Sequence, residues 1–273
     1  MIKEISSLQN DLVKEIIQLQ EKSRARKKQG LFIIEGQREI KLAIEGAYSL
    51  KQLLFCEDII SKSEVDQLFT TSGLQQPPVL IKISIQVYQK IAHRKTTEGV
   101  VAVAESKELS IKGLDLKNDC LILVAEASEK PGNIGALLRT ADAANLDAVI
   151  IANPKTDFYN PNIIRSSVGC VFTNQIAQGS TDEILELLKQ KKINIYAAAL
   201  DKRSLPYHQM DYTKASAIVV GTEATGLSEQ WMENANQNII IPMQGKIDSL
   251  NVSVSAAIVI FEAKRQRNFS LPK

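Results

Sequence analysis

The stretch Ile218–Arg267 reads IVVGTEATGLSEQWMENANQNIIIPMQGKIDSLNVSVSAAIVIFEAKRQR. Its two apolar runs, Ile218–Val220 and Ile239–Ile241, have the length and composition of buried strands. A polar turn with glycine follows each run, and the second turn leads into a helix that we expect over Leu250–Arg267, starting near Ser249. Ligands of α/β proteins bind in the loops at the carboxyl ends of such strands. The stretch therefore predicts a binding site formed by these two turns.

Strands and helices are expected to alternate along the rest of the chain, which indicates an α/β fold. The polar stretch 107–119 has the composition of a linker. We therefore expect an N-terminal α/β domain over residues 1–106 and a second domain over residues 120–273. The strands of the second domain are continuous apolar runs, which is typical of a mostly parallel sheet covered on both faces. These expected strands are Leu121–Val124, Ala148–Ile151, Ile193–Ala198, Ile218–Val220 and Ile239–Ile241.

The composition is that of an ordinary globular protein. The formal net charge of the 273 residues is only +2, so overall charge does not indicate a nucleic-acid binder, although a local patch still could. Cys56, Cys120 and Cys170 lack metal-ligand spacing, and we expect reduced thiols, most of them buried, in a cytoplasmic protein. The first residues lack the apolar core of a signal peptide, and no apolar run has the length of a membrane span. We expect neither a metal nor a membrane partner.

The segment Asn133-Ile-Gly-Ala-Leu-Leu-Arg139 follows the first expected strand of the second domain. Asn133 has the side chain of a helix N-cap, and Gly135 lets a ligand or another segment approach the start of the helix. Arg139 would lie about two turns into that helix. Taken alone, the segment fits a capped helix with a surface pair between Arg139 and Asp142. Alternatively, Arg139 presents its guanidinium group to a phosphate.

The first glycine turn is Gly221-Thr-Glu-Ala-Thr-Gly226. Its glycines are expected to adopt positive φ angles, which would make it an ordinary connection between a strand and a helix. Glu223 could cap the following helix, or it could bind a hydroxyl group or a base edge of a ligand. The dinucleotide fingerprint GxGxxG and the phosphate loop of nucleoside-triphosphate enzymes do not occur in the sequence, so those two chemistries are poorly supported.

The last helix is expected to open with Ser249-Leu-Asn-Val-Ser-Val-Ser255, with Ser249 as its N-cap. The helix is apolar almost all round, which predicts that it is buried. Asn251, Ser253 and Ser255 then need partners, either backbone carbonyl groups or a ligand. The expected wide apolar face comprises Leu250, Val254, Ala257, Ile258 and Phe261.

A basic cluster ends the first expected helix, Asn10–Lys28. Such a run is often a solvated face, but it could equally bind the phosphate backbone of a nucleic acid. His93 and His208 lie far apart in the sequence, and we interpret both as structural or surface residues. The cluster comprises Lys22, Arg24, Arg26, Lys27 and Lys28.

Together these segments resemble the SpoU-type (TrmH-like) RNA ribose 2'-O-methyltransferases of the SPOUT superfamily. The three family motifs occur in order, as NIGALLRTADAANLDAVII, IVVGTEATGLS and SLNVSVSAAIVIFEAKRQR. The basic helix and the GLFIIEGQREIKLAIEG that follows it resemble the family's substrate-binding domain, so the resemblance covers nearly the whole chain. Each motif alone is weakly specific, whereas the three together at this spacing are highly specific.

The resemblance implies a fold, a cofactor and an assembly. The second domain would be a parallel-sheet SPOUT domain with a trefoil knot, an arrangement otherwise nearly absent from proteins. The N-terminal domain would be a small ribosomal-protein-like α/β domain that binds RNA. The knotted loops would hold S-adenosyl-L-methionine largely through backbone groups, and two copies would form a homodimer through the C-terminal domain. The implied cofactor-binding residues are Leu200, Gly221, Thr222, Gly226, Ile241, Met243 and Leu250.

The implied reaction is methyl transfer to a ribose 2'-hydroxyl group of RNA. Arg139 would bind the target phosphate and stabilise the developing alkoxide, because an arginine in a protein is practically never deprotonated. The implied catalytic residues are Arg139, Asn133, Glu223, Asn251 and Ser249. The implied RNA-binding residues are Lys22, Arg24, Arg26, Lys27, Lys28 and Arg165.

The resemblance of the N-terminal domain to that of ribosomal-RNA-directed enzymes favours 23S rRNA as the substrate. Three alternatives stay open: a transfer RNA methyltransferase, a non-catalytic RNA-binding module of the same fold, and a methyltransferase for a small molecule. The intact motif residues argue against the non-catalytic module. The basic helix and the separate N-terminal domain argue against a small substrate, which needs neither.

Overall fold

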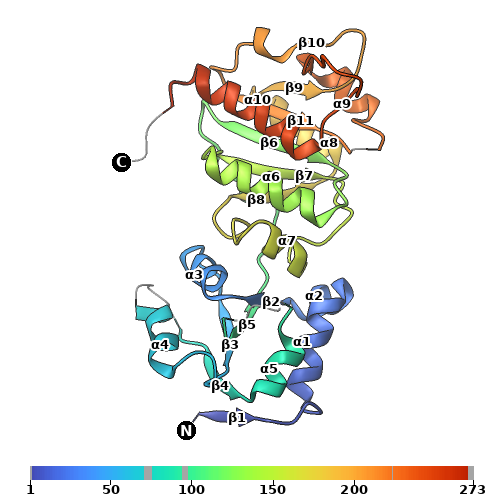
Figure 1. Ribbon diagram of the computed structural model, residues 1–273. Helices are drawn as coiled ribbons and strands as arrows, with labels where there is room; N and C mark the ends of the chain where they lie inside the picture. Colours follow the sequence, from blue (N-terminus) through green and yellow to red (C-terminus); the bar gives the residue numbers. More distant parts are fainter. Residues whose placement is uncertain (1, 71–75, 94–97, 223, 270–273) are drawn as a thin grey trace. The chain divides into compact units, whose positions relative to one another are not determined.

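The computed structural model describes residues 2–70, 76–93, 98–222 and 224–269. The chain divides into two compact units (Figure 1). The N-terminal unit comprises Met1–Glu108 and Asp157–Thr173, and the C-terminal unit comprises Leu109–Thr156 and Asn174–Lys273. Each unit has its own sheet and its own core, so each is described by itself.

The N-terminal unit is built on a five-stranded mixed sheet with the order β1-β4-β3-β5-β2. Strand β5 is antiparallel to both of its neighbours, whereas β1 and β3 are parallel to β4. The strands are β1 (Lys3–Ile5), β2 (Leu31–Glu35), β3 (Leu50–Phe55), β4 (Val79–Ile83) and β5 (Val100–Glu105). The helices are α1 (Asp11–Glu21), α2 (Ser23–Gln29), α3 (Gln37–Glu45), α4 (Lys62–Thr70), α5 (Ile85–Ile91) and α7 (Pro161–Ser166).

The basic cluster lies on a helix of its own, and the prediction of one continuous helix over Asn10–Lys28 is wrong. Asn10 does cap α1, because its side chain accepts a hydrogen bond from the Leu12 N–H. The chain then leaves the helical conformation at Lys22, which has φ −116° and ψ 110°. Helix α2 starts after this break. The side chains of its seven residues therefore do not continue the faces of α1.

The segment Asp157–Thr173 packs within the N-terminal unit, although the predicted boundaries place it in the second domain. Two of its aromatic side chains lie against Phe32 of β2, with ring centroids 4.3 Å away for Tyr159 and 6.0 Å away for Phe172. Tyr48 completes this cluster edge-on. Buried aromatic pairs of this kind dominate core energetics. The segment therefore supplies part of the core that the first hundred residues need.

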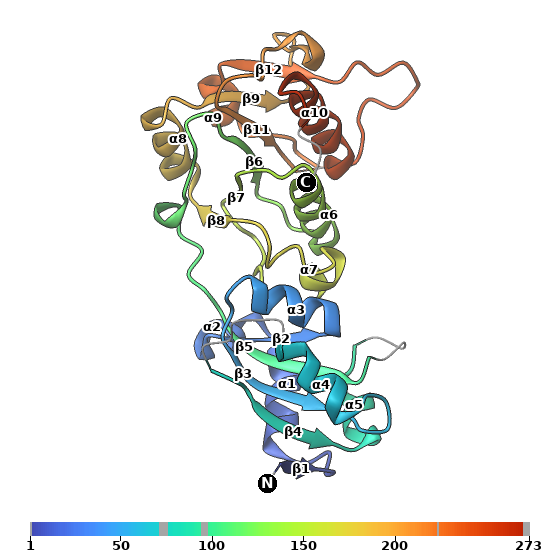
Figure 2. The same ribbon diagram turned by 90° about the vertical axis from the view of Figure 1, so that its left-hand side faces the viewer.

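The C-terminal unit contains a seven-stranded sheet with the order β10-β12-β9-β11-β6-β7-β8, and every pair in it is parallel. Helices α6 and α10 cover one face and α8 and α9 cover the other (Figure 2). The strands are β6 (Leu121–Glu126), β7 (Ala148–Ala152), β8 (Ile176–Gly179), β9 (Asn194–Ala198), β10 (Leu205–Pro206), β11 (Ser216–Val220) and β12 (Gln237–Ile240). The helices are α6 (Pro131–Ala143), α8 (Thr181–Gln190), α9 (Glu229–Asn234) and α10 (Val252–Gln266).

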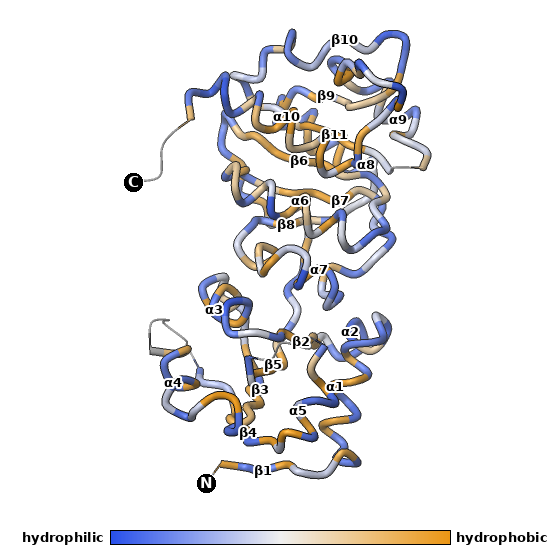
Figure 3. The backbone as a smooth tube through the Cα atoms, in the orientation of Figure 1, coloured by the Kyte–Doolittle hydropathy of each residue, from blue (hydrophilic) through white to orange (hydrophobic). Residues whose placement is uncertain are grey.

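This sheet confirms the predicted α/β class and its parallel strands. The central strands β6, β7 and β11 are buried along their whole length, as continuous apolar runs predict. The most hydrophobic stretches of this unit follow those strands and α10 (Figure 3). Within the described residues, no helix combines the length and the apolar character needed to cross a membrane.

Most of the expected linker, residues 107–119, is an ordered part of the C-terminal unit. The Gln178 N–H donates to the Leu109 carbonyl at 2.8 Å, and Ser110 forms a parallel bridge with Gln178. Ile111 and Leu114 pack against the hydrophobic core. The apolar residues scattered among the lysines of this stretch explain the difference, because they bury surface that a free linker would expose.

Helix α10 is not buried all round. The face that was predicted to be buried points outward, where Val254 is 46% exposed and Phe261 is 40% exposed. Five different residues form the buried stripe. The stripe follows the i, i+4, i+7 and i+8 spacing of one helix face. The inward residues are Val252, Ala256, Val259, Ile260 and Ala263.

Candidate active site

The carboxyl ends of neighbouring strands of the C-terminal unit open into one groove of about 740 Å³. The loops after β9, β11 and β12 line it, together with the first turn of α10. All seven residues predicted to bind a cofactor line this groove: Leu200, Gly221, Thr222, Gly226, Ile241, Met243 and Leu250. Ser249 and Asn251 line it as well. The parallel sheet thus gathers segments that are distant in sequence.

The loop after β11 is closed by its own backbone. Thr222 and Gly226 exchange two N–H···O=C hydrogen bonds of 3.1 Å, and the Thr222 hydroxyl lies 2.8 Å from that of Thr225. Gly226 has φ +67°, as predicted for a turn glycine. The prediction of a positive φ angle is wrong for Gly221. Glycine is needed there because a Cβ would lie 2.2 Å from the Gly226 carbonyl carbon. Glu223 lies outside the described residues.

Asn251, and not Ser249, caps helix α10. The Asn251 side chain accepts hydrogen bonds from the Ser253 N–H at 3.0 Å and from the Ser253 hydroxyl at 2.6 Å. Ser249 instead donates its hydroxyl to Asp248 at 3.0 Å. The helix starts two residues later than the predicted cap allows, so Ser249 stays in the loop that lines the groove.

Asn133 joins the first motif to the third. Helix α6 starts at Pro131, so Asn133 lies inside its first turn and is not the predicted N-cap. Its side-chain oxygen accepts a hydrogen bond from the Asn251 amide at 3.2 Å. Two segments separated by 118 positions are therefore held together beside the groove.

Arg139 projects from α6 as an exposed side chain and does not line the groove. The alternative of a surface pair between Arg139 and Asp142 is not seen, since Arg139 forms no ion pair with any described residue. Its guanidinium group is available to a phosphate. Arg139 thus lies on a helix, as the sequence predicts, but it is not among the residues that line the groove.

Glu126 is a residue of this region that was not predicted from the sequence. It ends β6, is only 7% exposed, and accepts hydrogen bonds from both the N–H and the hydroxyl of Ser228. The available signal was a single acidic residue at the end of the apolar run LILVAE. A buried carboxylate at the carboxyl end of a strand needs polar partners, and here those partners belong to the loop after β11.

In the N-terminal unit, four of the predicted RNA-binding residues are exposed on or next to α2: Lys22, Arg24, Lys27 and Lys28. The prediction that Arg26 binds RNA is wrong, because this residue is only 4% exposed. Its Nε donates to Asp157 at 2.5 Å, and its Nη1 donates to the Leu19 carbonyl at 2.6 Å. Its position on the inner side of α2 turns Arg26 into an internal ion-pair partner and not a phosphate contact.

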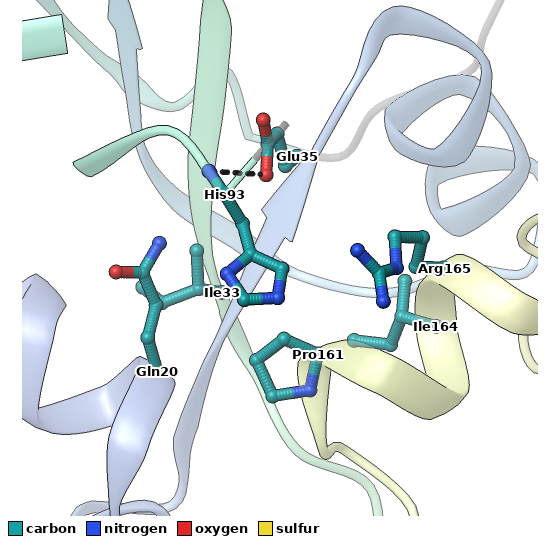
Figure 4. Close-up of a pocket in the computed structure, with 7 residues that line it drawn as sticks. All are labelled: Gln20, Ile33, Glu35, His93, Pro161, Ile164 and Arg165. Atoms are coloured by element: carbon teal, nitrogen blue, oxygen red, sulfur yellow. Dashed lines mark hydrogen bonds between the residues drawn. The ribbon is translucent and has the colours of Figure 1, made fainter. Parts of the chain in front are cut away.

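Arg165 is exposed on α7, where its guanidinium group donates to Asn162 at 3.1 Å. It borders a small depression with Glu35 and His93, and the His93 N–H donates to the Glu35 carboxylate at 3.0 Å (Figure 4). The space inside is about 20 Å³, which suits one water molecule and not a nucleobase. The depression is therefore a surface feature beside Arg165.

The three cysteines are free thiols, with Cys56 and Cys120 buried and Cys170 partly buried. Burial raises the pKa of the Cys56 and Cys120 thiols, which keeps both in the unreactive protonated form. Among the described residues, no three acidic, histidine or cysteine side chains gather as a metal site would require.

Known protein families match both units of the chain. The model of the SpoU rRNA methylase family matches residues 120–261, slightly more than half of the chain. The chain belongs to the SpoU rRNA methylase family. A second family model, the MRM3-like substrate binding domain, matches residues 10–102 of this SpoU family member. The first match contains all strands of the C-terminal sheet, and the second contains β2, β3, β4 and the start of β5 of the N-terminal sheet.

Three known proteins illustrate the similarity of this SpoU methylase to its relatives. A 23S rRNA (guanosine(2553)-2'-O)-methyltransferase of Bacillus subtilis, RlmP, is 27% identical over 263 residues, 96% of this chain and 100% of the relative. An AdoMet-bound rRNA methyltransferase of Sinorhizobium meliloti has a TM-score of 0.88 at 26% identity, covering 98% of this chain and 99% of that one. A tRNA (guanosine(18)-2'-O)-methyltransferase of Thermus thermophilus is 36% identical over 148 residues, 54% of this chain and 75% of the relative.

The groove fits S-adenosylmethionine. Its volume of about 740 Å³ lies in the range of small-molecule sites. Backbone of the glycine loop and neutral side chains such as Leu200, Ile241 and Met243 form its lining, with Asp248 as the charged exception among the described residues. Apolar walls suit an adenine ring, and backbone N–H and C=O groups suit its edge and the ribose hydroxyl groups.

Proposed function

We propose that the protein transfers a methyl group from S-adenosylmethionine to a ribose 2'-hydroxyl group of 23S rRNA. The observation that carries the proposal is the groove of the C-terminal unit, where the loops of the second and third motifs meet and the first motif is bonded to the third. The full-length similarity to a 23S rRNA methyltransferase supports the substrate class.

The groove residues would hold the cofactor. Leu200, Ile241, Met243 and Leu250 would pack against its apolar parts, and the backbone of Gly221, Thr222 and Gly226 would bond its polar edges. Bound S-adenosylmethionine supplies an electrophilic methyl group that needs no further activation. The remaining task of the protein is to orient the ribose hydroxyl group toward this groove, which is mainly a matter of positioning.

Arg139 would bind the phosphate of the target nucleotide and stabilise the alkoxide as the hydroxyl proton leaves to phosphate or water. A guanidinium group cannot accept that proton, but its fork of donors fits a phosphate in two-point geometry. Asn133 and Asn251, already bonded to each other, would fix the first and third motifs around the nucleotide. Glu223 would contact the nucleotide, and Ser249 would brace the loop before α10.

RNA would be bound by the exposed cations of the N-terminal unit, namely Lys22, Arg24, Lys27, Lys28 and Arg165. Arg26 is not part of this set, because its side chain is buried against Asp157. Phosphate contacts from lysine and arginine supply sequence-independent affinity. A substrate-binding domain precedes the methylase domain in this chain, and the tRNA-directed relative matches only about half of the chain. Both observations favour ribosomal RNA over transfer RNA.

A homodimer through the C-terminal unit would cover the outer face of α10. Val254, Phe261 and Phe269 are 46%, 40% and 51% exposed there, and the rings of Phe261 and Phe269 lie 6.4 Å apart. Exposed apolar side chains in one patch are typical of an interface. Light scattering after size exclusion should give twice the mass of the chain, and Val254→Glu should reduce it to one chain.

We further propose that the C-terminal segment forms the trefoil knot of the SPOUT superfamily and that the protein acts in the cytoplasm. The strand order, in which β12 and α10 follow β11 in sequence but β9 lies between β11 and β12 in the sheet, supports a threaded connection. Slow, concentration-independent refolding after full denaturation would be expected of a threaded chain.

The deciding experiment is methyl transfer from labelled S-adenosylmethionine to unmodified total RNA, separated into ribosomal and transfer fractions. We expect label in 23S rRNA that survives alkaline cleavage, because a 2'-O-methyl group removes the nucleophile of that cleavage. Label in transfer RNA would keep the reaction and overturn the substrate. Binding of S-adenosylmethionine without label in either fraction would favour a non-catalytic RNA-binding module.

A further inference from the structure

Glu126 and Ser228 form a two-point contact next to Gly226 and Leu227, which line the groove. The Ser228 N–H donates to Glu126 Oε2 at 2.8 Å, and the Ser228 hydroxyl donates to Glu126 Oε1 at 2.7 Å. Ser228 occupies the N-cap position of α9, yet its side chain makes no capping hydrogen bond to that helix. Both donors of Ser228 are therefore committed to a carboxylate 102 positions earlier in the chain.

This contact fixes the end of the loop that follows β11. The loop begins at Val220, the last residue of a strand paired with β6, and it reaches Ser228 directly after Gly226 and Leu227. Two backbone hydrogen bonds join Thr222 to Gly226, so the two ends of the turn are held together. The strand β11 positions the start of the turn, and the Glu126 carboxylate positions Ser228 at its end.

Neither Glu126 nor Ser228 lines the groove, whereas Gly226 and Leu227 do. A ligand in the groove would therefore not touch the carboxylate. A change in ligand affinity after substitution of Glu126 or Ser228 would have to pass through the position of the loop.

The buried contact between Glu126 and Ser228 costs more free energy than an apolar pair that fills the same space. Glu126 is 7% exposed and forms no ion pair within the described residues, so its charge is compensated by hydrogen bonds alone. Burying a carboxylate costs free energy that such bonds offset, and an apolar side chain would fill the same space without that cost. Two charge-assisted hydrogen bonds, in contrast, fix both distance and direction.

We propose that Glu126 is a positioning residue for the cofactor: through Ser228 it holds Gly226 and Leu227, which line the groove, in their binding geometry. The proposal rests on the proposed function, because it takes this groove as the S-adenosylmethionine site. It assigns to Glu126 a role in cofactor affinity and no contact with the substrate or the reacting atoms.

The test measures the dissociation constant of S-adenosylmethionine by calorimetry for wild type, Glu126→Gln, Ser228→Ala and the double variant. Each single variant should weaken binding about tenfold, the size expected when a hydrogen bond to a charged group is removed. The double variant should bind S-adenosylmethionine as well as the single variant with the lower affinity, since both substitutions break the same interaction. Ser228→Thr keeps the hydroxyl group and should bind nearly as well as wild type.

Steady-state kinetics separate positioning from chemistry. The KM for S-adenosylmethionine should rise with the dissociation constant, while the KM for RNA and kcat at saturating cofactor stay near the wild-type values. The emission of Trp231, the one tryptophan of the sequence, reports folding beside the contact, because Trp231 is buried and its backbone N–H donates to the Ser228 carbonyl at 3.1 Å.

Ser180→Ala is the matched control. The Ser180 N–H and hydroxyl both donate to Glu183 at 2.8 Å, which is the same chemistry in the same unit, away from the groove. Wild-type affinity in Glu126→Gln and Ser228→Ala would overturn the proposal, and so would an equal loss in Ser180→Ala. Failure of the wild-type protein to bind S-adenosylmethionine would instead contradict the proposed function.

Discussion

The two units present their candidate ligand-binding surfaces in opposite ways. The groove of the C-terminal unit is lined mainly by backbone and neutral side chains, and its shape depends on how closely glycine loops can approach. The α2 region of the N-terminal unit presents exposed cations around one buried arginine, Arg26. Shape should therefore control the first surface, and charge should control the second. Substitutions that alter one property at a time can test this difference.

The largest expected effect follows from breaking the buried ion pair between Arg26 and Asp157, whose side chains are 5% and 8% exposed. Arg26→Met leaves the carboxylate buried without its partner, which costs about 3–5 kcal/mol of stability. Thermal unfolding should show the N-terminal unit melting earlier, with RNA binding abolished and S-adenosylmethionine affinity kept. The double variant Arg26→Met/Asp157→Leu removes both charges and should recover much of the stability. Equal instability of the single and double variants would contradict this account.

Arg139→Lys should lower kcat about 100-fold, the size typical of removing a donor to developing charge. Lysine keeps the charge but not the two-point geometry of the guanidinium group. The dissociation constant of S-adenosylmethionine should not change, because Arg139 does not line the groove. Single-turnover methyl transfer at saturating cofactor measures this step. Activity near wild type would remove the proposed role of Arg139 in the reaction.

Gly221→Ala tests shape alone, since Gly221 does not have a positive φ angle. The added Cβ would lie 2.2 Å from the Gly226 carbonyl atoms, so the loop has to open. Overpacking of this kind costs about 1–3 kcal/mol, and we expect S-adenosylmethionine affinity to fall between about 5-fold and 150-fold with RNA affinity unchanged. Gly245→Ala is the control, because no atom lies within 4 Å of a Cβ built there. Similar affinities for the two variants would show that the loop does not determine the binding site.

The groove of the C-terminal unit was easier to predict from the sequence than the cationic surface of the N-terminal unit. Apolar runs predicted every central strand of the parallel sheet, and parallel topology places their carboxyl ends together, so all seven predicted cofactor residues line one groove. The strands β1, β8 and β10 were not predicted, because their sequences KEI, IAQG and LP contain no continuous apolar run. The predicted N-cap of α10, Ser249, lies two residues before the observed N-cap, Asn251. Serine and asparagine can both cap a helix, so the sequence did not distinguish them.

Burial of single charged residues could not be predicted from local sequence. Arg26 lies within a run of cations, and its partner Asp157 is 131 positions away in a segment assigned to the other domain. Glu126 and Ser228 are 102 positions apart. In both cases a tertiary contact decides whether a polar side chain faces water or the interior. Helix α10 shows the same limit for apolar residues. Apolar side chains on all sides of a helix do not indicate which face another element covers.

The smallest expected effect concerns the exposed cations of α2. Lys27→Gln and Lys28→Gln each remove one charge from a side chain that lies in solvent, so each should weaken RNA binding only a few-fold and leave stability unchanged. Removing one phosphate-binding cation should reduce the slope of log affinity against log salt concentration by about 0.7 to 0.9. Lys41→Gln, an exposed lysine of α3 in the same unit, is the matched control and should leave the slope unchanged. If all three variants changed the slope equally, the unit would bind RNA through its overall charge, and α2 would have no special role.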